Sequence, residues 1–415
     1  MSTIELNRYV VVRKQSGDLL RLVKVTKGAY VVIEKLRFSL ANAIGKPFGL
    51  FEVRNGEIRE SLTPQAVAGG ALLGLNNFRP QKRSATEETG DEPPEKVVQK
   101  LTEEEIVALK EEGTAVDHLV TQLVEGNVNF DKRTNFSKEK YIAKKQKHHS
   151  DKVFIIDPTL RLIATALFRR GPEHIAYLRP DLLAQILHHS ALIFGGKALV
   201  YEESSGLIAA AVMQRFEGKG EMYYLHRGVS PTTHQALHAM NFNPLETAVF
   251  RPIKLSVYLD LINRPVDTPM PTAESELTND STTHHHHHAS DNNNPTNSHQ
   301  DLREAEIAEQ LFWIRDRLID SAVMDALILA GDSVSVAQLL EKTYHCLRTS
   351  GAVVVYANIQ EEVVQVVQYL EKQNAICILV QEQMCREVQV LKDRCHPALQ
   401  TPVSGGYFVT AYKTL

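Results

Sequence analysis

The second half of this chain alternates between apolar, strand-like stretches and helix-like stretches, and this alternation constrains the fold more than any other feature. Because parallel neighbouring strands need a crossover connection, it predicts a layered α/β domain with a mostly parallel sheet. The predicted strands are residues 153–156, 198–201, 222–225, 325–329, 352–356 and 376–380. The predicted helices are residues 179–187, 207–215, 302–318, 334–347 and 360–373. Residues 406–413 are predicted to form an edge strand.

The N-terminal part of the chain shows a different pattern. At 415 residues the chain is longer than one hydrophobic core normally spans, so two domains are expected. Residues 8–14, 19–25 and 30–36 are short stretches rich in β-branched residues. Residues 48–53 and the Asn55-Gly56 turn add a hairpin. This spacing predicts a small antiparallel barrel or sandwich over residues 1–80.

Segments of biased composition set the other expected boundaries. Residues 81–100 are polar, contain paired prolines and lack periodicity, which predicts a mobile linker. Residues 101–152 are predicted to be a helical and then basic connecting segment. Residues 265–300, rich in Thr, Asn, Ser and Pro, cannot bury a core and are predicted to be a low-complexity insertion. The α/β domain is therefore expected to consist of residues 153–264 and 301–415.

Composition argues against several classes of protein. Hydrophobic residues at 43% and charged residues at 23% are ordinary for a globular protein. No apolar run approaches the roughly 20 residues of a membrane helix, and the N-terminus does not resemble a secretory signal. The four cysteines, all between Cys346 and Cys395, suit a reducing compartment rather than a disulfide framework. With a net charge of −4, the chain needs a local basic patch to contact nucleic acid.

The turn after residues 198–201 has the layout of a nucleotide-cofactor site, in which a strand, a small-residue turn and a helix N-terminus follow one another. Class I methyltransferases bind S-adenosylmethionine at this place, and glycines let the backbone approach the ligand. Here the turn keeps only Gly206 and has Glu202, Glu203, Ser204 and Ser205 before it. S-adenosylmethionine carries a carboxylate, and a like-charge contact at about 4 Å costs about 4 kcal/mol, or roughly three decades of affinity.

The next strand supports the same interpretation. Such folds usually end it with an acidic residue that binds the ribose hydroxyls, whereas this strand ends in Leu225-His226. The predicted fold class is therefore α/β: an N-terminal β-rich, barrel-like domain followed by a Rossmann-like class I methyltransferase fold with a degenerate cofactor site. The alternative is a divergent working site, which would make the chain an active S-adenosylmethionine-dependent RNA methyltransferase.

A basic segment covers residues 132–152. If it is helical, Lys140, Lys144 and Lys147 share one face and can neutralise phosphates, which gives salt-dependent binding of nucleic acid. Phe136 offers a ring that can stack on an unpaired base. The alternative is a solvated helix face. The candidate RNA-binding residues are Arg133, Lys138, Lys140, Tyr141, Lys144, Lys145 and Lys147.

Other motifs are assigned structural roles. The histidine run from His284 to His288 is interpreted as a low-complexity spacer, with chelation of a metal as the alternative, and Cys395-His396 lacks the spacing of a metal site. Arg179 and Asp181 are expected to pair at the start of a helix, with a role at a subunit interface as the alternative. Gly405-Gly406 is expected to allow a tight turn into the last strand, with an approach to RNA as the alternative.

Three stretches resemble one known family. Phe136-Ser137-Lys138-Glu139-Lys140-Tyr141-Ile142 is similar to a stretch in the non-catalytic subunit of the eukaryotic tRNA (adenine-58-N1) methyltransferase. Leu178-Arg179 with the residues up to Leu187 resembles the same family. So does Asp393-Arg394-Cys395-His396-Pro397 with Ser404-Gly405-Gly406-Tyr407. Together the matches span about residues 130–230 and 320–415.

The resemblance implies a complex of two copies of this chain with two copies of a homologous catalytic subunit. That partner would bind S-adenosylmethionine, whereas this chain would bind no cofactor. The complex would methylate N1 of adenosine 58 in tRNA, usually in the nucleus. Neither subunit is expected to bind a membrane. This chain would bind tRNA and shape the partner's active site. Asp332 departs from the family, since some relatives have a basic residue there. A general RNA-binding adaptor unrelated to methylation is a further alternative.

Overall fold

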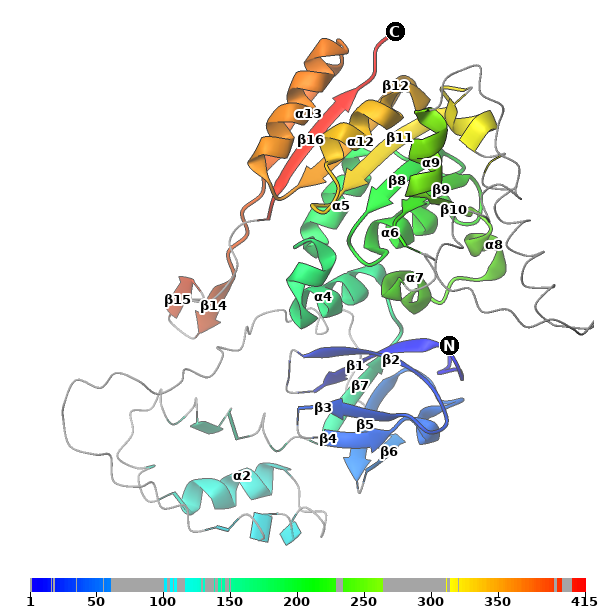
Figure 1. Ribbon diagram of the computed structural model, residues 1–415. Helices are drawn as coiled ribbons and strands as arrows, with labels where there is room; N and C mark the ends of the chain where they lie inside the picture. Colours follow the sequence, from blue (N-terminus) through cyan, green and yellow to red (C-terminus); the bar gives the residue numbers. More distant parts are fainter. Residues whose placement is uncertain are drawn as a thin grey trace, which may run out of the picture. The chain divides into compact units, whose positions relative to one another are not determined.

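The computed structural model describes most of the chain as two compact units (Figure 1). The first consists of Met1–Arg169 and Cys385–Val403, and the second of Arg170–Met384 and Ser404–Leu415. The predicted linker and insertion, and most of the predicted helix at residues 302–318, lie outside the described residues. The described residues are all residues of the chain except 1, 16, 18, 35, 55, 61–100, 103, 104, 107, 110–115, 128, 129, 131–137, 139, 140, 143, 146–148, 150, 229–233, 264–310, 312, 313, 320, 392, 393 and 398–404.

The first unit is built around an antiparallel five-stranded sheet in the order β2-β1-β7-β5-β6. These strands are β2 (Leu20–Lys24), β1 (Tyr9–Lys14), β7 (Lys152–Ile156), β5 (Gly49–Arg54) and β6 (Glu57–Glu60). A separate pair joins β3 (Tyr30–Ile33) to β4 (Leu36–Ser39). The five-stranded sheet and this pair share one hydrophobic core, which contains Phe38 and Phe51. The predicted N-terminal strands are confirmed, and so is the hairpin, in which Gly56 has a φ of +76°.

The strand at residues 153–156 belongs to the first unit, so its assignment to the α/β domain is wrong. As β7 it pairs with β1 on one side and β5 on the other. Val153 and Ile155 are buried, whereas Phe154 and Ile156 are only half-buried. This alternation is typical of an antiparallel strand with one buried face, whereas the strands of a covered parallel sheet are buried on both faces. The helices α2 (Val116–Glu125) and α4 (Leu160–Arg170) complete the larger elements described in this part of the chain.

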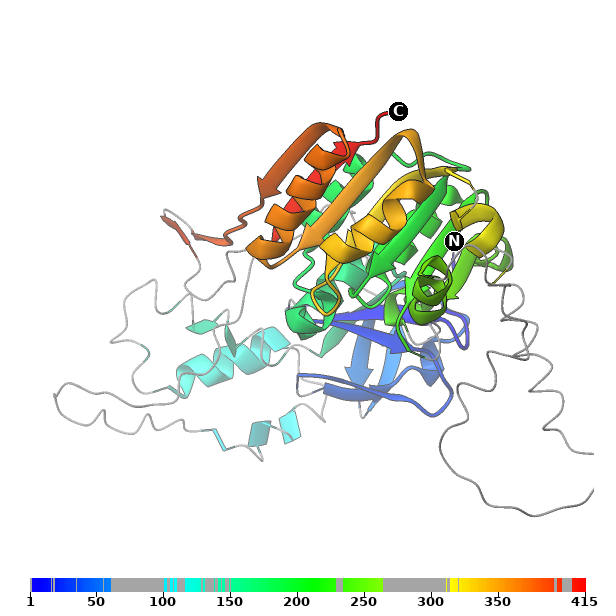
Figure 2. The same ribbon diagram turned by 45° about the horizontal axis from the view of Figure 1, so that its top comes forward.

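The second unit contains a seven-stranded sheet in the order β10-β9-β8-β11-β12-β16-β13 (Figure 2). The first five are parallel, and β16 is antiparallel to both of its neighbours, so the predicted mostly parallel sheet is confirmed. The strands are β8 (Lys197–Glu202), β9 (Glu221–His226), β10 (Phe250–Lys254), β11 (Met324–Ala330), β12 (Leu347–Ala357), β13 (Ile376–Glu382) and β16 (Tyr407–Tyr412).

Helices pack on this sheet. On one face, α9 (Leu255–Ile262), α12 (Val336–Thr343) and α13 (Gln360–Lys372) share a hydrophobic core with the strands. Figures 1 and 2 show α12 and α13 side by side. The helices α5 (Pro180–His189) and α6 (Leu207–Phe216) contact each other and also β12 and β8, respectively. The smaller helices are α7 (Gln235–Ala239) and α8 (Pro244–Thr247).

The last strand, β16, is not the predicted edge strand. It pairs with β12 on one side and with β13 on the other. Its residues Phe408, Val409, Thr410 and Ala411 are all buried, as expected for a strand inside a covered sheet. The edges of this sheet are β10 and β13. The C-terminal position of β16 in the sequence therefore does not predict its position in the sheet.

Candidate functional site

The predicted degenerate cofactor site lies where the strand order of the second unit reverses. The chain runs outward from β8 through β9 to β10, and then returns to β11 on the other side of β8. Open α/β sheets bind ligands outside the carboxyl ends of the strands at such a point. Glu202 ends β8, and Gly206 is the N-cap of α6 with a φ of +85°. A Cβ atom on Gly206 would also lie 2.7 Å from the Cβ atom of His234, which explains why this position is a glycine.

Glu202 is buried and turns toward α6. Its carboxylate accepts hydrogen bonds from the backbone N–H of Ile208 at 3.0 Å and of Ala209 at 2.7 Å, and from the hydroxyl of Ser204. The first-turn N–H groups have no partner within the helix and are the groups with which a helix N-terminus binds an anion. Glu202 therefore takes two donors that an anionic ligand would use. Burial raises the pKa of Glu202 above its ordinary value, although the three hydrogen bonds oppose that shift.

Glu203 extends from the end of β8 to the turn that follows β11. Its Oε2 accepts hydrogen bonds from the N–H of Asp332 at 3.0 Å and from the N–H and hydroxyl of Ser333 at 2.9 and 2.7 Å. Its Oε1 accepts from the hydroxyl of Tyr201 at 2.5 Å. Burial alone would raise the pKa of Glu203, but these hydrogen bonds outweigh it and hold the pKa below its ordinary value. A Cβ atom on Gly331 would lie 2.8 Å from the carboxyl carbon of Glu203, so the side chain fills the space beside this glycine.

Asp332 is held by the chain's own groups. Its two carboxylate oxygens accept hydrogen bonds from the N–H and the side-chain amide of Asn358, at 3.1 and 2.6 Å. Asn358 and Tyr356 both donate to the carbonyl of Ala176, at 2.9 and 3.0 Å. This network joins the turns after β11 and β12. The sequence analysis missed Ser333 and Asn358, although each is a polar residue just after a buried strand, which is a usable signal.

The end of β9 carries no acidic group. His226 is buried, and burial lowers its pKa. The hydroxyl of Tyr224 lies 2.8 Å from Nε2 of His234. Burial is also the largest cause of the lowered pKa of His234, to which His238 adds. At ordinary pH these imidazoles are therefore neutral, and they do not replace the acidic residue that the ribose site of such folds uses.

The basic segment is described only in part. The ammonium of Lys138 lies 5.5 Å from the ring centre of Phe130, and that of Lys145 lies 5.6 Å from the ring centre of Tyr141. The rings of Phe130 and Tyr141 are 5.7 Å apart. Tyr141 is half-buried and Lys144 is exposed. The structure thus places Lys138 and Tyr141 beside Phe130, and Lys145 beside Tyr141. The sequence analysis missed Phe130. The other candidates, Arg133, Lys140 and Lys147, lie outside the described residues, as does Phe136.

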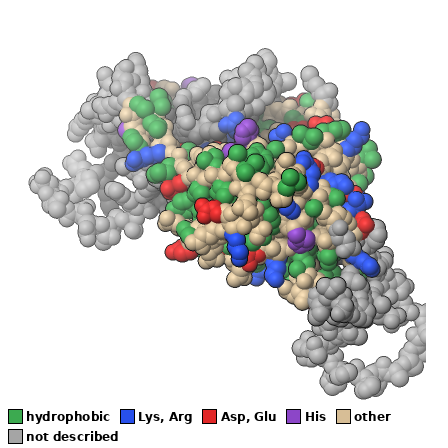
Figure 3. All heavy atoms as spheres, turned by 90° about the horizontal axis from the view of Figure 1, so that it is seen from above, with side chains coloured by type: hydrophobic (Ala, Val, Ile, Leu, Met, Phe, Trp, Pro, Cys, Tyr) green, Lys and Arg blue, Asp and Glu red, His purple; other side chains and the backbone are tan. Residues whose placement is uncertain are grey.

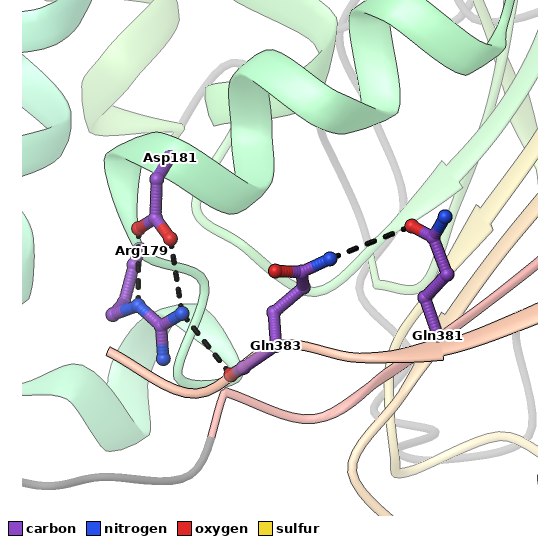
Figure 4. A network of polar contacts seen from close by, with 4 residues as sticks. All are labelled: Arg179, Asp181, Gln381 and Gln383. Atoms are coloured by element: carbon purple, nitrogen blue, oxygen red, sulfur yellow. Dashed lines mark hydrogen bonds and ion pairs between the residues drawn. The ribbon is translucent and has the colours of Figure 1, made fainter. Parts of the chain in front are cut away.

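Arg179 and Asp181 form the predicted pair (Figure 4). The guanidinium donates two hydrogen bonds to the carboxylate, at 3.0 and 2.9 Å, and a third to the carbonyl of Gln383 at 3.2 Å. Only 7% of the Arg179 side chain is exposed. A Cβ atom on Gly405 would overlap the guanidinium, so this glycine lets the cation pack against the backbone. The pair therefore connects the start of α5 with the chain just after β13.

The described residues contain no group of three or more His, Cys, Asp and Glu side chains placed to hold a metal ion. The histidine run lies outside them. Within the same described part of the chain, every helix is too short or too polar to span a membrane. Lys and Arg side chains are interspersed with acidic and apolar ones on the face seen from above (Figure 3).

Comparisons with known proteins agree with the resemblance. The chain is 26% identical to the tRNA (adenine(58)-N(1))-methyltransferase non-catalytic subunit TRM6 of Mus musculus, over 97% of this chain and 87% of that protein. It is also 26% identical to the subunit of the same name in Dictyostelium discoideum, over 98% of this chain and 78% of that protein.

A solved structure confirms the predicted fold. An S-adenosylmethionine-dependent O-methyltransferase of Thermotoga maritima aligns over 100% of this chain and 95% of its own, with a TM-score of 0.50 and 11% identity. A family model described as the Gcd10p family matches residues 3–309, which is more than half of the chain. The chain therefore belongs to the Gcd10p family.

Proposed function

We propose that this chain is a non-catalytic subunit of the tRNA (adenine-58-N1) methyltransferase, which binds tRNA and acts together with a catalytic partner. Relatives that match nearly the whole chain are named as non-catalytic subunits of this enzyme. The observation on the molecule that carries the proposal is the arrangement of side chains at the carboxyl end of β8. There, Glu202 accepts hydrogen bonds from the N-terminus of α6, and Glu203 accepts them from the turn after β11.

S-adenosylmethionine does not fit the residues at this end of β8. To use the N-terminus of α6, the ligand would have to displace Glu202 from the N–H groups of Ile208 and Ala209. Hydrogen bonds to a charged group contribute about 1.5–3 kcal/mol each, so displacement would cost about 3–6 kcal/mol. That corresponds to roughly two to four decades of affinity. The ligand's own carboxylate would in addition face Glu203. We therefore propose that the partner subunit alone supplies the cofactor site.

The contribution of this chain is then electrostatic and architectural. In the basic segment, the ammonium groups of Lys138 and Lys145 lie over aromatic rings and Lys144 is exposed. Cations held in this way neutralise phosphates without reading the base sequence. With Arg133, Lys140 and Lys147, they form the proposed tRNA-binding segment. We further propose a heterotetramer of two copies of each subunit, located in the nucleus.

The test is methyl transfer to tRNA by three preparations: this chain alone, its catalytic partner alone, and the two mixed. We expect transfer at position 58 only from the mixture, with tRNA carrying guanosine at that position as the control. Transfer by this chain alone would favour the active-enzyme alternative instead. Transfer by the partner alone at the rate of the mixture would remove the need for this subunit. Absence of a stable complex would favour the general RNA-binding adaptor.

A further inference from the structure

The segment that leads into α5 has an unusual backbone. It consists of the short 3-10 helix η3 (Pro172–Ile175) and the residues after it, Ala176 and Tyr177. Ala176 has a φ of +49° and Tyr177 a φ of +56°, so two successive residues with side chains are left-handed. This conformation is unfavourable for residues other than glycine, and more so for a bulky one. Such strain persists only where the surrounding structure enforces it, and it is concentrated at binding and active sites.

Hydrogen bonds enforce this conformation. The carbonyl of Ala176 accepts hydrogen bonds from the hydroxyl of Tyr356 at 3.0 Å and from the side-chain amide of Asn358 at 2.9 Å. The N–H of Tyr177 donates to the carbonyl of Pro172 at 2.8 Å. Contacts with the end of β12 and with η3 itself therefore fix the strained turn in place.

The same segment lies at the carboxyl ends of the strands. Asn358 directly follows β12. The carbonyl of His174 accepts a hydrogen bond at 3.0 Å from the hydroxyl of Ser205, in the turn after β8. The segment is thus joined to two turns at the end of the sheet where proteins of this fold bind their ligands. Because Glu202 and Glu203 take the hydrogen-bond donors of the cofactor site, we expect a ligand at this end to be substrate rather than cofactor.

The strained backbone presents an aromatic side chain to solvent. Tyr177 is 46% exposed, whereas the residues on either side of it, Ala176 and Leu178, are buried. Glycine and asparagine are the residues that adopt left-handed backbone most readily. Packing in the core does not account for an exposed tyrosine at such a position. The ring therefore needs an explanation outside the fold.

The surroundings of this ring indicate what it contacts. Between Pro172 and Asp181, the other exposed side chains are all polar: Glu173 and His174 lie 3.6 Å apart, and Asp181 pairs with a buried guanidinium. A protein interface surrounds its aromatic anchors with further residues that exclude water. A single exposed ring among polar groups instead suits a nucleic-acid base, which offers an aromatic face and keeps polar edges.

We propose that Tyr177 is a substrate-binding residue, which stacks on an unpaired base of the tRNA. The hydrogen-bonded turn keeps the backbone at this residue in one conformation, so less conformational entropy is lost when a base stacks on the ring. Stacking accepts any base, and it adds a base contact to the phosphate contacts of the basic segment. This inference rests on the proposed function, which makes tRNA the ligand of the chain.

The first test is methyl transfer by the mixture of this chain with its catalytic partner, at varied concentrations of tRNA. Tyr177→Ala should raise the KM for tRNA by about fivefold or more and change kcat less, because stacking on one base contributes at least that much affinity. Tyr177→Phe keeps the ring and should behave like the unmodified chain. Tyr177→Leu keeps apolar surface without a flat ring, and should behave like Tyr177→Ala.

Phe194→Ala is the matched control. Phe194 is 51% exposed, and it precedes β8, so it lies at the opposite end of the strands from Tyr177. Its removal should leave the KM for tRNA unchanged. If Tyr177→Ala and Tyr177→Leu also keep the KM of the unmodified chain, the stacking role is refuted.

The strain allows a second measurement, which separates binding from folding. Asparagine tolerates left-handed backbone better than tyrosine does. Tyr177→Asn should therefore melt at the temperature of the unmodified chain or above it, while its KM for tRNA rises as for Tyr177→Ala. A clearly lower melting temperature would mean that the ring stabilises the fold instead, and would overturn the proposal.

A third measurement separates RNA from protein as the ligand. Calorimetry gives the dissociation constants of Tyr177→Ala for tRNA and for the catalytic subunit. Weaker binding to tRNA alone supports the proposal, whereas weaker binding to the catalytic subunit with unchanged binding to tRNA assigns the ring to the subunit interface and overturns it.

The two proposals fail in different ways. If the mixture of unmodified chain and partner does not methylate tRNA, the proposed function fails. If the mixture methylates tRNA and the KM does not depend on the ring of Tyr177, only the stacking role fails.

Discussion

Replacing Glu202 by alanine tests the structural core of this account, because Glu202 stabilises the start of α6. The substitution leaves the buried N–H groups of Ile208 and Ala209 without an acceptor. Each unsatisfied buried donor costs about 1–3 kcal/mol. The same change removes a buried carboxylate whose desolvation is unfavourable, as its raised pKa indicates, and this offsets part of the loss. We expect a net destabilisation of about 2–4 kcal/mol.

Differential scanning calorimetry measures the effect. For a folding unit of this size, 1 kcal/mol shifts the melting temperature by roughly 2–4 °C, so the second unit should melt roughly 5–15 °C lower. Glu202→Gln keeps one oxygen acceptor and the volume, and should cost less than Glu202→Ala. Glu371→Ala, at an exposed site on α13, is the control. If Glu202→Ala and Glu371→Ala melt at the same temperature, the carboxylate does not hold α6 as described.

Three further predictions concern the two glutamates, the basic segment and Arg179. The stabilities of Glu202→Gln and Glu203→Gln, relative to the unmodified chain, should depend on pH with opposite sign in denaturation profiles. Because the pKa of Glu202 is raised, its contribution to stability falls as pH rises above the ordinary carboxyl range. Because the pKa of Glu203 is lowered, its contribution is lost as pH falls through that pKa. Replacing Lys140, Lys144 and Lys147 by glutamine should lower the salt slope of tRNA binding by about one per lost phosphate contact in filter-binding titrations, while the exposed set Lys24, Lys27 and Lys372 should leave it unchanged. Arg179→Lys cannot keep the bidentate contact with Asp181 and the contact with Gln383 together, so amides after β13 should exchange faster than in Arg169→Lys, and equal rates would contradict this role.

Local sequence pattern predicts most of the elements of this fold but not which strands pair. The strands β8, β9 and β11 are buried apolar runs between helices, and their type and approximate position follow from the sequence. The assignments of β7 and β16 went wrong because a strand's partners come from distant parts of the chain. The alternating burial of β7 is visible only in the structure, because residues 153–156 are a continuous apolar run in the sequence. Nothing local marks β16 as an inner strand either.

The candidate site was predictable in character rather than in detail. Glu202 and Ser204 at positions where glycines are expected, with Glu203 between them, indicate that the turn after β8 is a poor site for an anionic ligand. The carboxylate of Glu203 accepts a hydrogen bond from Ser333, which lies 130 residues further along the chain. This contact follows only from the three-dimensional arrangement. The ring contacts of Lys138 and Lys145 likewise depend on side-chain directions that spacing alone does not determine.

The most direct test of the central claim is a calorimetric titration of the purified, full-length chain with S-adenosylmethionine, with the catalytic subunit and the assembled complex titrated in parallel. We predict saturable binding by the partner and the complex, and no binding by this chain alone, because its own glutamates occupy the hydrogen-bond donors at the end of β8. Saturable binding of one molecule of S-adenosylmethionine by the isolated chain would contradict that claim.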